Sequence, residues 1–273
     1  MNRKRKPKLP EGIEMPTVEP RIDPDLVTQT RRYKLITPLY GGGVTPGEAD
    51  PITIVRASEV RGHLRFWWRA TRGGQFDGDL EKMRKAEEAI WGSAAGKDKP
   101  GPSEVTIVIR VLDRGQPFQA TNRKGDSIDN IGHPSSKFGY VAFPLRDSKH
   151  PVVLQDVEFE LTLTYRKTLK LPFDKIEVKK EVNAAFWAWE SFGGLGARTR
   201  RGFGAVQLEA IDNATVSQLL SADTEDAINR FLKEHVVDGN WPQDVPHLSH
   251  AMHRCVFTYW TLDKIGHQEL NNG

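Results

Sequence analysis

Two segments in which apolar and polar residues alternate constrain the fold most. One lies at 104–112 and the other at 157–165, and the apolar positions are Val105, Ile107, Ile109 and Val111 in the first and Val157, Phe159, Leu161 and Leu163 in the second. An apolar side chain at every second position is typical of a strand with one buried face. Both segments are therefore predicted to be strands of a half-buried sheet.

Helical and strand-like segments surround these two strands in a regular order. We expect strands at 31–39 and 203–211, helices at 59–72 with Ser58 as N-cap and at 175–192 with Asp174 as a candidate cap, and a short helix at 79–91. The order strand, helix, strand, strand, helix, strand is that of the ferredoxin-like (RRM-like) fold, in which two helices cover one face of an antiparallel sheet. The sequence thus predicts an α+β chain with one such unit over 31–211.

The two ends of the chain differ from this central unit. Residues 1–30 are basic and interrupted by five prolines, so they are predicted to form a mobile arm. Helical patterns at 215–236 and a strand-like run at 255–262 make 212–273 a candidate for a second, smaller or incomplete ferredoxin-like unit.

Composition limits the functional classes only broadly. The 273 residues carry a net charge of +3, so an argument for nucleic-acid binding must rest on where the charges lie. Cys255 is the single cysteine, which excludes an internal disulfide framework. The sequence contains neither a long apolar run nor the apolar core of a signal peptide, and a cytoplasmic protein is expected.

The segment 193–204 (GGLGARTRRGFG) combines five glycines with three arginines. Glycines allow a ligand to approach the main chain, and guanidinium groups bind phosphates. The segment lacks the GxxxxGK[ST] pattern and precedes a strand rather than a helix, so it favours a longer polyanion over a mononucleotide. The alternative is a plain surface loop after a helix that Gly193 caps.

The predicted helix at 59–72 has two different faces. Val60, Leu64, Trp67 and Thr71 project to an apolar face, and Arg61, Arg65, Trp68, Arg69 and Arg72 project to another. Like charges at this spacing repel each other unless an anion relieves them, and backbone phosphates with a stacked base would do so. The alternative is a solvated basic face.

Two further stretches are candidates for ligand contact. Gly41, Gly42 and Gly43 follow the first strand and either expose backbone N–H groups to an anion or form a simple turn. The irregular insertion at 114–150 contains Asn122, Arg123, Lys124, Lys137, Phe138 and Tyr140. A long insertion of this kind is usually functional or disordered, and we expect it to contact RNA or a protein partner.

Three of these motifs together resemble a known family. The stretch Thr37-Pro38-Leu39 with the three glycines, the run at 61–70 (RGHLRFWWRA) and the loop 193–204 are similar to the RAMP superfamily, most closely to the first RAMP subunit of the Cmr complex, the type III-B CRISPR effector. The resemblance implies ferredoxin-like domains that bind CRISPR guide RNA through the glycine-rich loop and the first helix. It also implies a place near the guide's 3′ portion and the end of the guide–target duplex, other RAMP subunits and target RNA as partners, and target cleavage in another subunit.

The sequence therefore predicts a non-enzymatic RNA-binding subunit in antiviral defence, without cofactor or metal. The predicted RNA-binding residues are Gly41, Gly42, Gly43, Arg61, Arg65, Trp68, Arg69, Arg72, Gly193, Gly194, Gly196, Arg198, Thr199, Arg200, Arg201 and Phe203. Trp68 or Phe203 is expected to stack on a base.

The alternative function is a metal-independent endoribonuclease that processes CRISPR RNA with His63 as general acid/base. The helix projection directs His63 away from the arginine face, so we expect it to point away from bound RNA.

Two groups of residues in the sequence have side chains of the kinds that bind metal ions. His247, His250, His253 and Cys255 carry suitable ligand atoms but match no established spacing, and histidines in a polar loop are the simpler interpretation. Asp126, Asp129 and Asp147 match no calcium or paired-carboxylate motif.

Overall fold

A computed structural model describes residues 23–41, 52–93, 101–148, 152–171, 175–216 and 224–248. In this part of the chain the main sheet has the order β11-β10-β1-β7-β2, and its neighbouring strands are antiparallel. The strands are β1 (Leu26–Leu35), β2 (Thr106–Asp113), β7 (Glu158–Arg166), β10 (Val206–Ile211) and β11 (Ala214–Thr215). The four long strands lie side by side in the order β10-β1-β7-β2, so the fourth along the chain comes first, followed by the first, third and second. This order confirms the predicted α+β, ferredoxin-like arrangement.

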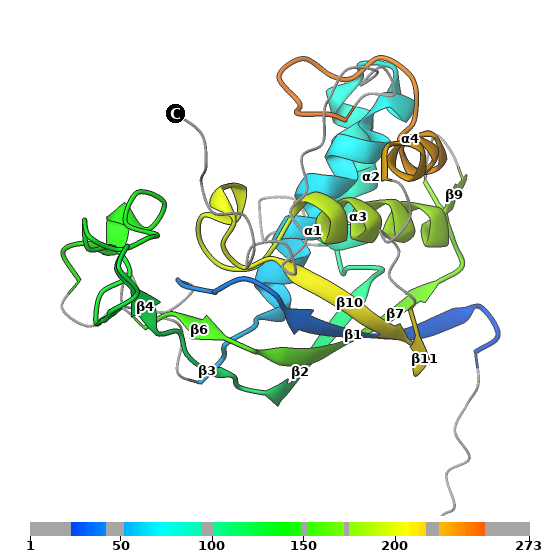
Figure 1. Ribbon diagram of the computed structural model, residues 1–273. Helices are drawn as coiled ribbons and strands as arrows, with labels where there is room; N and C mark the ends of the chain where they lie inside the picture. Colours follow the sequence, from blue (N-terminus) through cyan, green and yellow to red (C-terminus); the bar gives the residue numbers. More distant parts are fainter. Residues whose placement is uncertain are drawn as a thin grey trace, which may run out of the picture.

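The helices lie on one face of this sheet (Figure 1). They are α1 (Ala57–Arg72), α2 (Leu80–Trp91), α3 (Val178–Phe192) and α4 (Thr224–His235). The main core lies between the sheet and the pair α1 and α3, where Tyr33 and Phe159 stack with ring centroids 5.1 Å apart and Trp189 meets Tyr33 edge-on. The alternating apolar residues of β7 are all buried there, as their period of two requires.

The short elements of the chain are β3 (Gln116–Pro117), β4 (Ala120–Thr121), β5 (Ser127–Ile128), β6 (Leu154–Gln155), β8 (Thr168–Lys170), β9 (Lys175–Glu177) and the 3-10 turns η1 (Gly73–Phe76), η2 (Phe143–Leu145) and η3 (Thr199–Arg201).

A second apolar cluster belongs to the insertion between β2 and β7, coloured green in Figure 1. This cluster joins buried insertion residues such as Ala142 and Leu145 to Tyr40 and Phe203. The insertion is therefore packed against the end of β1 and the loop 193–204.

The first strand begins earlier than the sequence predicts. Residues 1–22 lie outside the described residues, but Leu26 already pairs with Arg166, and β1 continues in register along β7. The prediction that the arm extends to residue 30 is wrong, because Val27, Thr28 and Thr30 suit a strand once a partner strand is present.

Two predicted helix starts are also wrong. Arg56, rather than Ser58, occupies the N-cap of α1, and no side chain caps this helix. Helix α3 begins at Val178 because residues 175–177 form β9, in which buried Ile176 pairs with Leu169 of β8. The candidate cap Asp174 lies outside the described residues. The prediction at 79–91 is confirmed by α2, which has Gly92 as its C-cap.

Residues 224–248 pack on the ferredoxin-like unit. Helix α4 lies beside α3, and the following segment returns to α1, where the Trp241 Nε1–H donates to the carbonyl of Arg69 at 2.9 Å. The indole ring covers Gly73 and Gly74 so closely that a Cβ on Gly74 would lie 2.5 Å from it. The expected strand at 255–262 lies outside the described residues, and a second unit stays a prediction. In the part of the chain that the structure covers, no helix has the length and apolar character to cross a membrane.

Candidate functional site

The loop 193–204 is tied to the end of β1 by main-chain hydrogen bonds. Leu195 N–H donates to the Gly204 carbonyl at 2.8 Å, Gly204 N–H donates to the Pro38 carbonyl at 2.8 Å, and Ala197 N–H donates to the Tyr40 carbonyl at 2.9 Å. Gly41 also abuts the loop, since a Cβ on this residue would lie 3.0 Å from the Cβ of Ala197. The loop is therefore a fixed part of the fold rather than a flexible connection.

The loop glycines are required by internal contacts. A Cβ on Gly204 would lie 1.8 Å from the Leu195 carbonyl oxygen, and one on Gly196 would lie 2.4 Å from Leu39. A Cβ on Gly193 would lie 2.5 Å from the Trp189 ring, and one on Gly194 would lie 2.7 Å from the Gly204 carbonyl oxygen. Gly196 and Gly204 also have φ angles of +74° and +65°, which favour glycine. Protein atoms thus occupy the Cβ direction of these glycines, and close approach of a ligand to the backbone of Gly193, Gly194 and Gly196 stays a prediction.

The loop arginines have no carboxylate partner among the described residues. Arg200 and Arg201 are exposed, and Arg198 places its guanidinium 4.9 Å from the centre of the Phe143 ring. Arg198 Nε is buried and has no hydrogen-bond partner in the described part of the chain. Burial raises the pKa of Tyr40, and the charge of nearby Arg198 opposes this shift. Thr199, half-buried, begins the short turn η3 that carries Arg200 and Arg201.

Three of the four arginines of α1 are in the opposite situation. Arg65 and Arg69 both donate to Glu87 Oε1, at 2.6 and 2.5 Å, and Arg72 donates to Glu181 Oε1 at 2.8 Å. Glu87 and Glu181 are buried. The repulsion that was expected to require an external anion is thus relieved by carboxylates of the protein. Arg61 is half-buried, and its Nε atom lacks a hydrogen-bond partner among the residues described.

Neither aromatic residue that was predicted to stack on a base is accessible. Trp68 is fully buried and donates its indole N–H to Glu181 Oε2 at 2.8 Å. Phe203 is 4% exposed and packs edge-on against Tyr40. Trp68 is four residues after Leu64, so both side chains lie on the same buried face of α1. Trp67, which the sequence predicted to be in the core, is only partly buried. The two stacking predictions are wrong.

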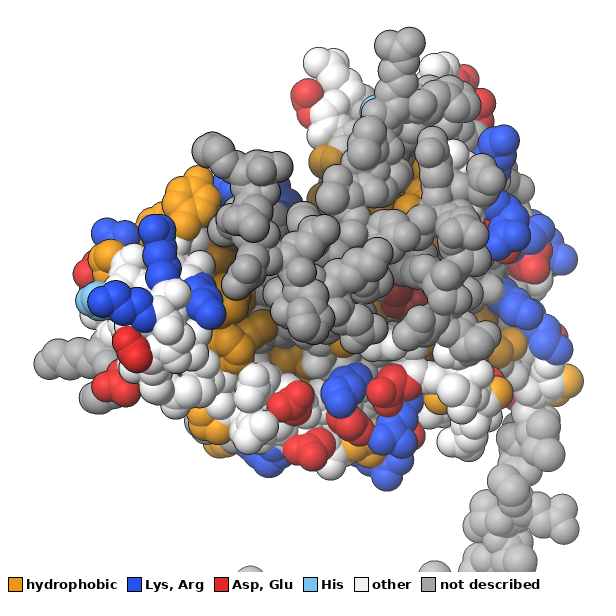
Figure 2. Space-filling view, in the orientation of Figure 1, with side chains coloured by type: hydrophobic (Ala, Val, Ile, Leu, Met, Phe, Trp, Pro, Cys, Tyr) orange, Lys and Arg blue, Asp and Glu red, His pale blue; other side chains and the backbone are white. Residues whose placement is uncertain are grey.

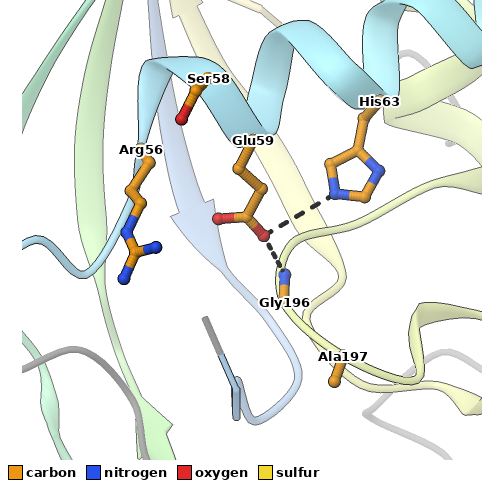
Figure 3. Close-up of a pocket in the computed structure, with 6 residues that line it drawn as sticks. All are labelled: Arg56, Ser58, Glu59, His63, Gly196 and Ala197. Carbon is orange, nitrogen blue, oxygen red and sulfur yellow. Dashed lines mark hydrogen bonds and ion pairs between the residues drawn. The ribbon is translucent and has the colours of Figure 1, made fainter. Parts of the chain in front are cut away.

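A pocket of about 460 Å³ lies where the loop meets the start of α1 (Figure 3). Its lining residues are Arg56, Ser58, Glu59, His63, Gly196 and Ala197. Glu59 Oε1 accepts the Gly196 N–H at 2.5 Å and lies 3.7 Å from His63 Nε2. His63 therefore faces the glycine-rich loop (Figure 3), and the expectation that it points away from bound RNA stays a prediction.

Several predicted residues cannot be placed. Gly42, Gly43, His250, His253 and Cys255 lie outside the described residues. His247 stacks on Trp241 with ring centroids 4.8 Å apart. Within the described ranges, no group of three or more His, Cys, Asp or Glu side chains could hold a metal ion.

A ferredoxin-like sheet with a glycine-rich loop fixed against its first helix defines the class of protein. Residues 32–207 match the sequence model of the RAMP superfamily, and the chain belongs to this superfamily. It is 24% identical over 183 residues to the CRISPR system Cmr subunit Cmr1-2 of Pyrococcus furiosus, covering 64% of this chain and 92% of the relative. It is 23% identical over 178 residues to subunit Cmr1-1 of the same organism, covering 65% of this chain and 47% of the relative.

Two solved structures are also similar. The crystal structure of Cmr1 from Pyrococcus furiosus in the apo form aligns with a TM-score of 0.48 and 22% identity over 77% of this chain and 58% of that chain. A chain in the cryo-EM structure of the type III-B Cmr-beta complex bound to cognate target RNA aligns with a TM-score of 0.47 and 15% identity, over 80% and 64% of the two chains. The chain thus spans little more than half the length of the Cmr1 crystal structure.

Proposed function

We propose that this chain is a non-catalytic, RNA-binding subunit of a type III-B CRISPR (Cmr) effector complex. In this role it holds the 3′ portion of the guide RNA near the end of the guide–target duplex and contacts other RAMP subunits. The observation that carries the proposal is the set of loop arginines, which the fold holds in place without a carboxylate partner among the described residues. Membership in the RAMP superfamily and similarity to two Cmr1 subunits support it.

The chemistry of this surface suits a phosphate backbone rather than particular bases. Guanidinium groups bind phosphate oxygens with forked hydrogen bonds, and contacts of this kind position a strand without reading its sequence. A guide-binding subunit needs this indifference, because every guide carries a different sequence. The main-chain hydrogen bonds of the loop fix the backbone from which the arginine side chains project.

The test is the triple substitution Arg198→Ala, Arg200→Ala and Arg201→Ala, with fluorescence anisotropy of a labelled guide-length RNA across a salt titration. If three phosphate contacts are lost, the slope of log K against log salt should fall by about 2, and Kd at 0.1 M salt should rise about 100-fold. The loss should be the same for RNAs of different sequence.

A matched control removes three exposed positive charges elsewhere. Lys82, Arg84 and Lys85 lie on the outer face of α2, and their replacement by Ala changes the net charge by the same amount. This control should retain most of the affinity. Equal weakening in both triple variants, or unchanged affinity in the loop variant, would refute the assignment of the loop.

The position of His63 supports a second candidate function, a metal-independent endoribonuclease. The imidazole shares a pocket with the glycine-rich loop and lies 3.7 Å from the Glu59 carboxylate, so it could transfer a proton beside a bound phosphate. CRISPR-repeat RNA incubated in EDTA with the wild type and with His63→Ala separates the two functions. We expect intact RNA with both proteins; discrete fragments that disappear with His63→Ala would establish the nuclease instead.

A further inference from the structure

The insertion between β2 and β7 presents two aromatic rings to solvent. Tyr140 is 80% exposed and Phe143, three residues later at the start of η2, is 53% exposed. In the described part of the chain, neither ring packs against another aromatic ring. Their neighbours Ala142 and Leu145 are buried in the second apolar cluster, so the backbone that carries the rings is fixed.

One of these rings, Phe143, lies against the arginine-rich loop. The guanidinium of Arg198 lies over one face of the Phe143 ring, 4.9 Å from the ring centre, and this contact joins the insertion to the loop. Below the surface, Phe203 of the loop and Tyr40 belong to the same apolar cluster as the core of the insertion. Phe203, which the sequence predicted to stack on RNA, is instead buried, and it helps to hold in place the insertion that carries Tyr140 and Phe143.

Positive charge is concentrated on the same two segments. Residues 114–148 and 193–204 together contain eight Lys and Arg residues and three Asp residues, a surplus larger than that of the whole chain. Arg123, Lys124, Lys137 and Arg146 are exposed on the same insertion as the rings. At the left of Figure 2, over the insertion, Lys and Arg side chains lie among hydrophobic ones.

We propose that Tyr140 and Phe143 form a stacking platform for unpaired bases of single-stranded RNA whose phosphates lie on the loop arginines. The inference rests on the proposed function and adds a base-contacting subsite to it. Aromatic rings surrounded by positive charge are the arrangement that binds single strands without sequence preference, since every base has a face that can stack. A base pair within a duplex has its faces covered by its neighbours, so the platform selects unpaired nucleotides.

The experiment uses the whole 273-residue chain with Tyr140→Ala and Phe143→Ala combined, and a labelled single-stranded 20-nucleotide RNA. Loss of stacking should raise Kd about 10- to 100-fold. The salt slope should stay unchanged because no phosphate contact is removed. The conservative pair Tyr140→Phe and Phe143→Tyr should retain the affinity. So should Leu80→Ala with Val108→Ala, which removes comparably exposed apolar side chains from α2 and β2.

A second probe tests the bases directly. The wild type should bind an RNA of the same length with abasic sites more weakly than the normal RNA, whereas the ring variant should bind both equally. Equal affinity of wild type and ring variant for normal RNA would overturn the inference and leave a protein partner as the occupant of the rings. If the ring variant behaves like the wild type while the loop variant loses affinity, only the inference fails; if the loop variant is also unchanged, the proposed function fails too.

Discussion

Two groups of arginines in this protein have the same chemistry and different surroundings. Those of α1, Arg65, Arg69 and Arg72, donate to buried Glu87 and Glu181. Those of the loop 193–204 have no carboxylate partner among the described residues, and one of them covers an exposed aromatic ring. A cluster of arginines therefore indicates a binding surface only when the fold leaves its charge uncompensated.

The difference arises from residues far away in the sequence. Glu87 is 22 residues from Arg65, and Glu181 is 109 residues from Arg72. A helix projection shows which side chains share a face, but it does not show which element packs against that face. The α1 arginines thus contribute to the fold, and the loop arginines remain available to a ligand.

The largest effect is expected from Glu181→Ala, which removes the carboxylate partner of Arg72 in α1. The carboxylate accepts hydrogen bonds from Trp68, Arg72 and Gln75, and its removal leaves the Arg72 charge without compensation. The free energy of unfolding should fall by about 3–5 kcal/mol, measured by urea denaturation. Glu177→Ala, at an exposed carboxylate paired with Lys180, is the control and should change little.

The same comparison predicts that Glu181→Ala, on α3, leaves RNA binding by the folded protein intact. A Glu181→Ala protein as stable as the wild type would contradict the structural role of Arg72 and Glu181. A changed salt slope of RNA binding would show that the two groups of arginines are not separate in function.

A smaller loss of stability is expected from Gly204→Ala, in the loop whose arginines have no carboxylate partner among the described residues. Gly204 has φ +65°, and an added Cβ would meet the Leu195 carbonyl, so the substitution should cost about 3 kcal/mol and displace the loop arginines. Gly202 has φ +87° but open space around it, and Gly202→Ala should cost only about 1 kcal/mol. Urea denaturation together with RNA anisotropy checks both variants. If Gly204→Ala and Gly202→Ala lowered the free energy of unfolding equally, the loop backbone would have to move freely enough to avoid the contact with the Leu195 carbonyl.

The smallest effect concerns pH. Burial, together with the charge of Arg72, lowers the pKa of His235 below its ordinary value, although Glu234 acts in the opposite direction. The unfolded chain then takes up a proton first as pH falls below ~6.5, so the free energy of unfolding should decrease between about pH 7 and pH 5. His235→Phe keeps the stack on Trp187 and should reduce this decrease. An unchanged pH profile would exclude His235 as a source of acid sensitivity.

The sequence predicted the order of the main elements because their periodic patterns are long. Strand β7 and helix α3 each bury a repeated face, and the period alone distinguishes them. Strand β9 was missed because three residues carry no usable period. The start of β1 was missed because Leu26 and Thr28 become strand residues only through pairing with β7.

The candidate site was predicted only in part. The glycine and arginine content of 193–204 identified the loop, because such a composition is unusual in a simple turn. The contact between Glu59 and Gly196 joins residues 137 positions apart, and no local pattern could show that this contact brings His63 to the loop. The burial of Phe203 likewise depends on the insertion, whose own irregular sequence gives no period.

The insertion also affects how the sheet assembles. Strands β2 and β7 are antiparallel neighbours that a turn of about four residues could join, yet 44 residues separate Asp113 from Glu158. Closing the longer loop costs about 2 kcal/mol more chain entropy, which the contacts inside the insertion must offset. Substitutions in its small core, which lies outside the main core, should therefore slow the pairing of β2 with β7 during folding.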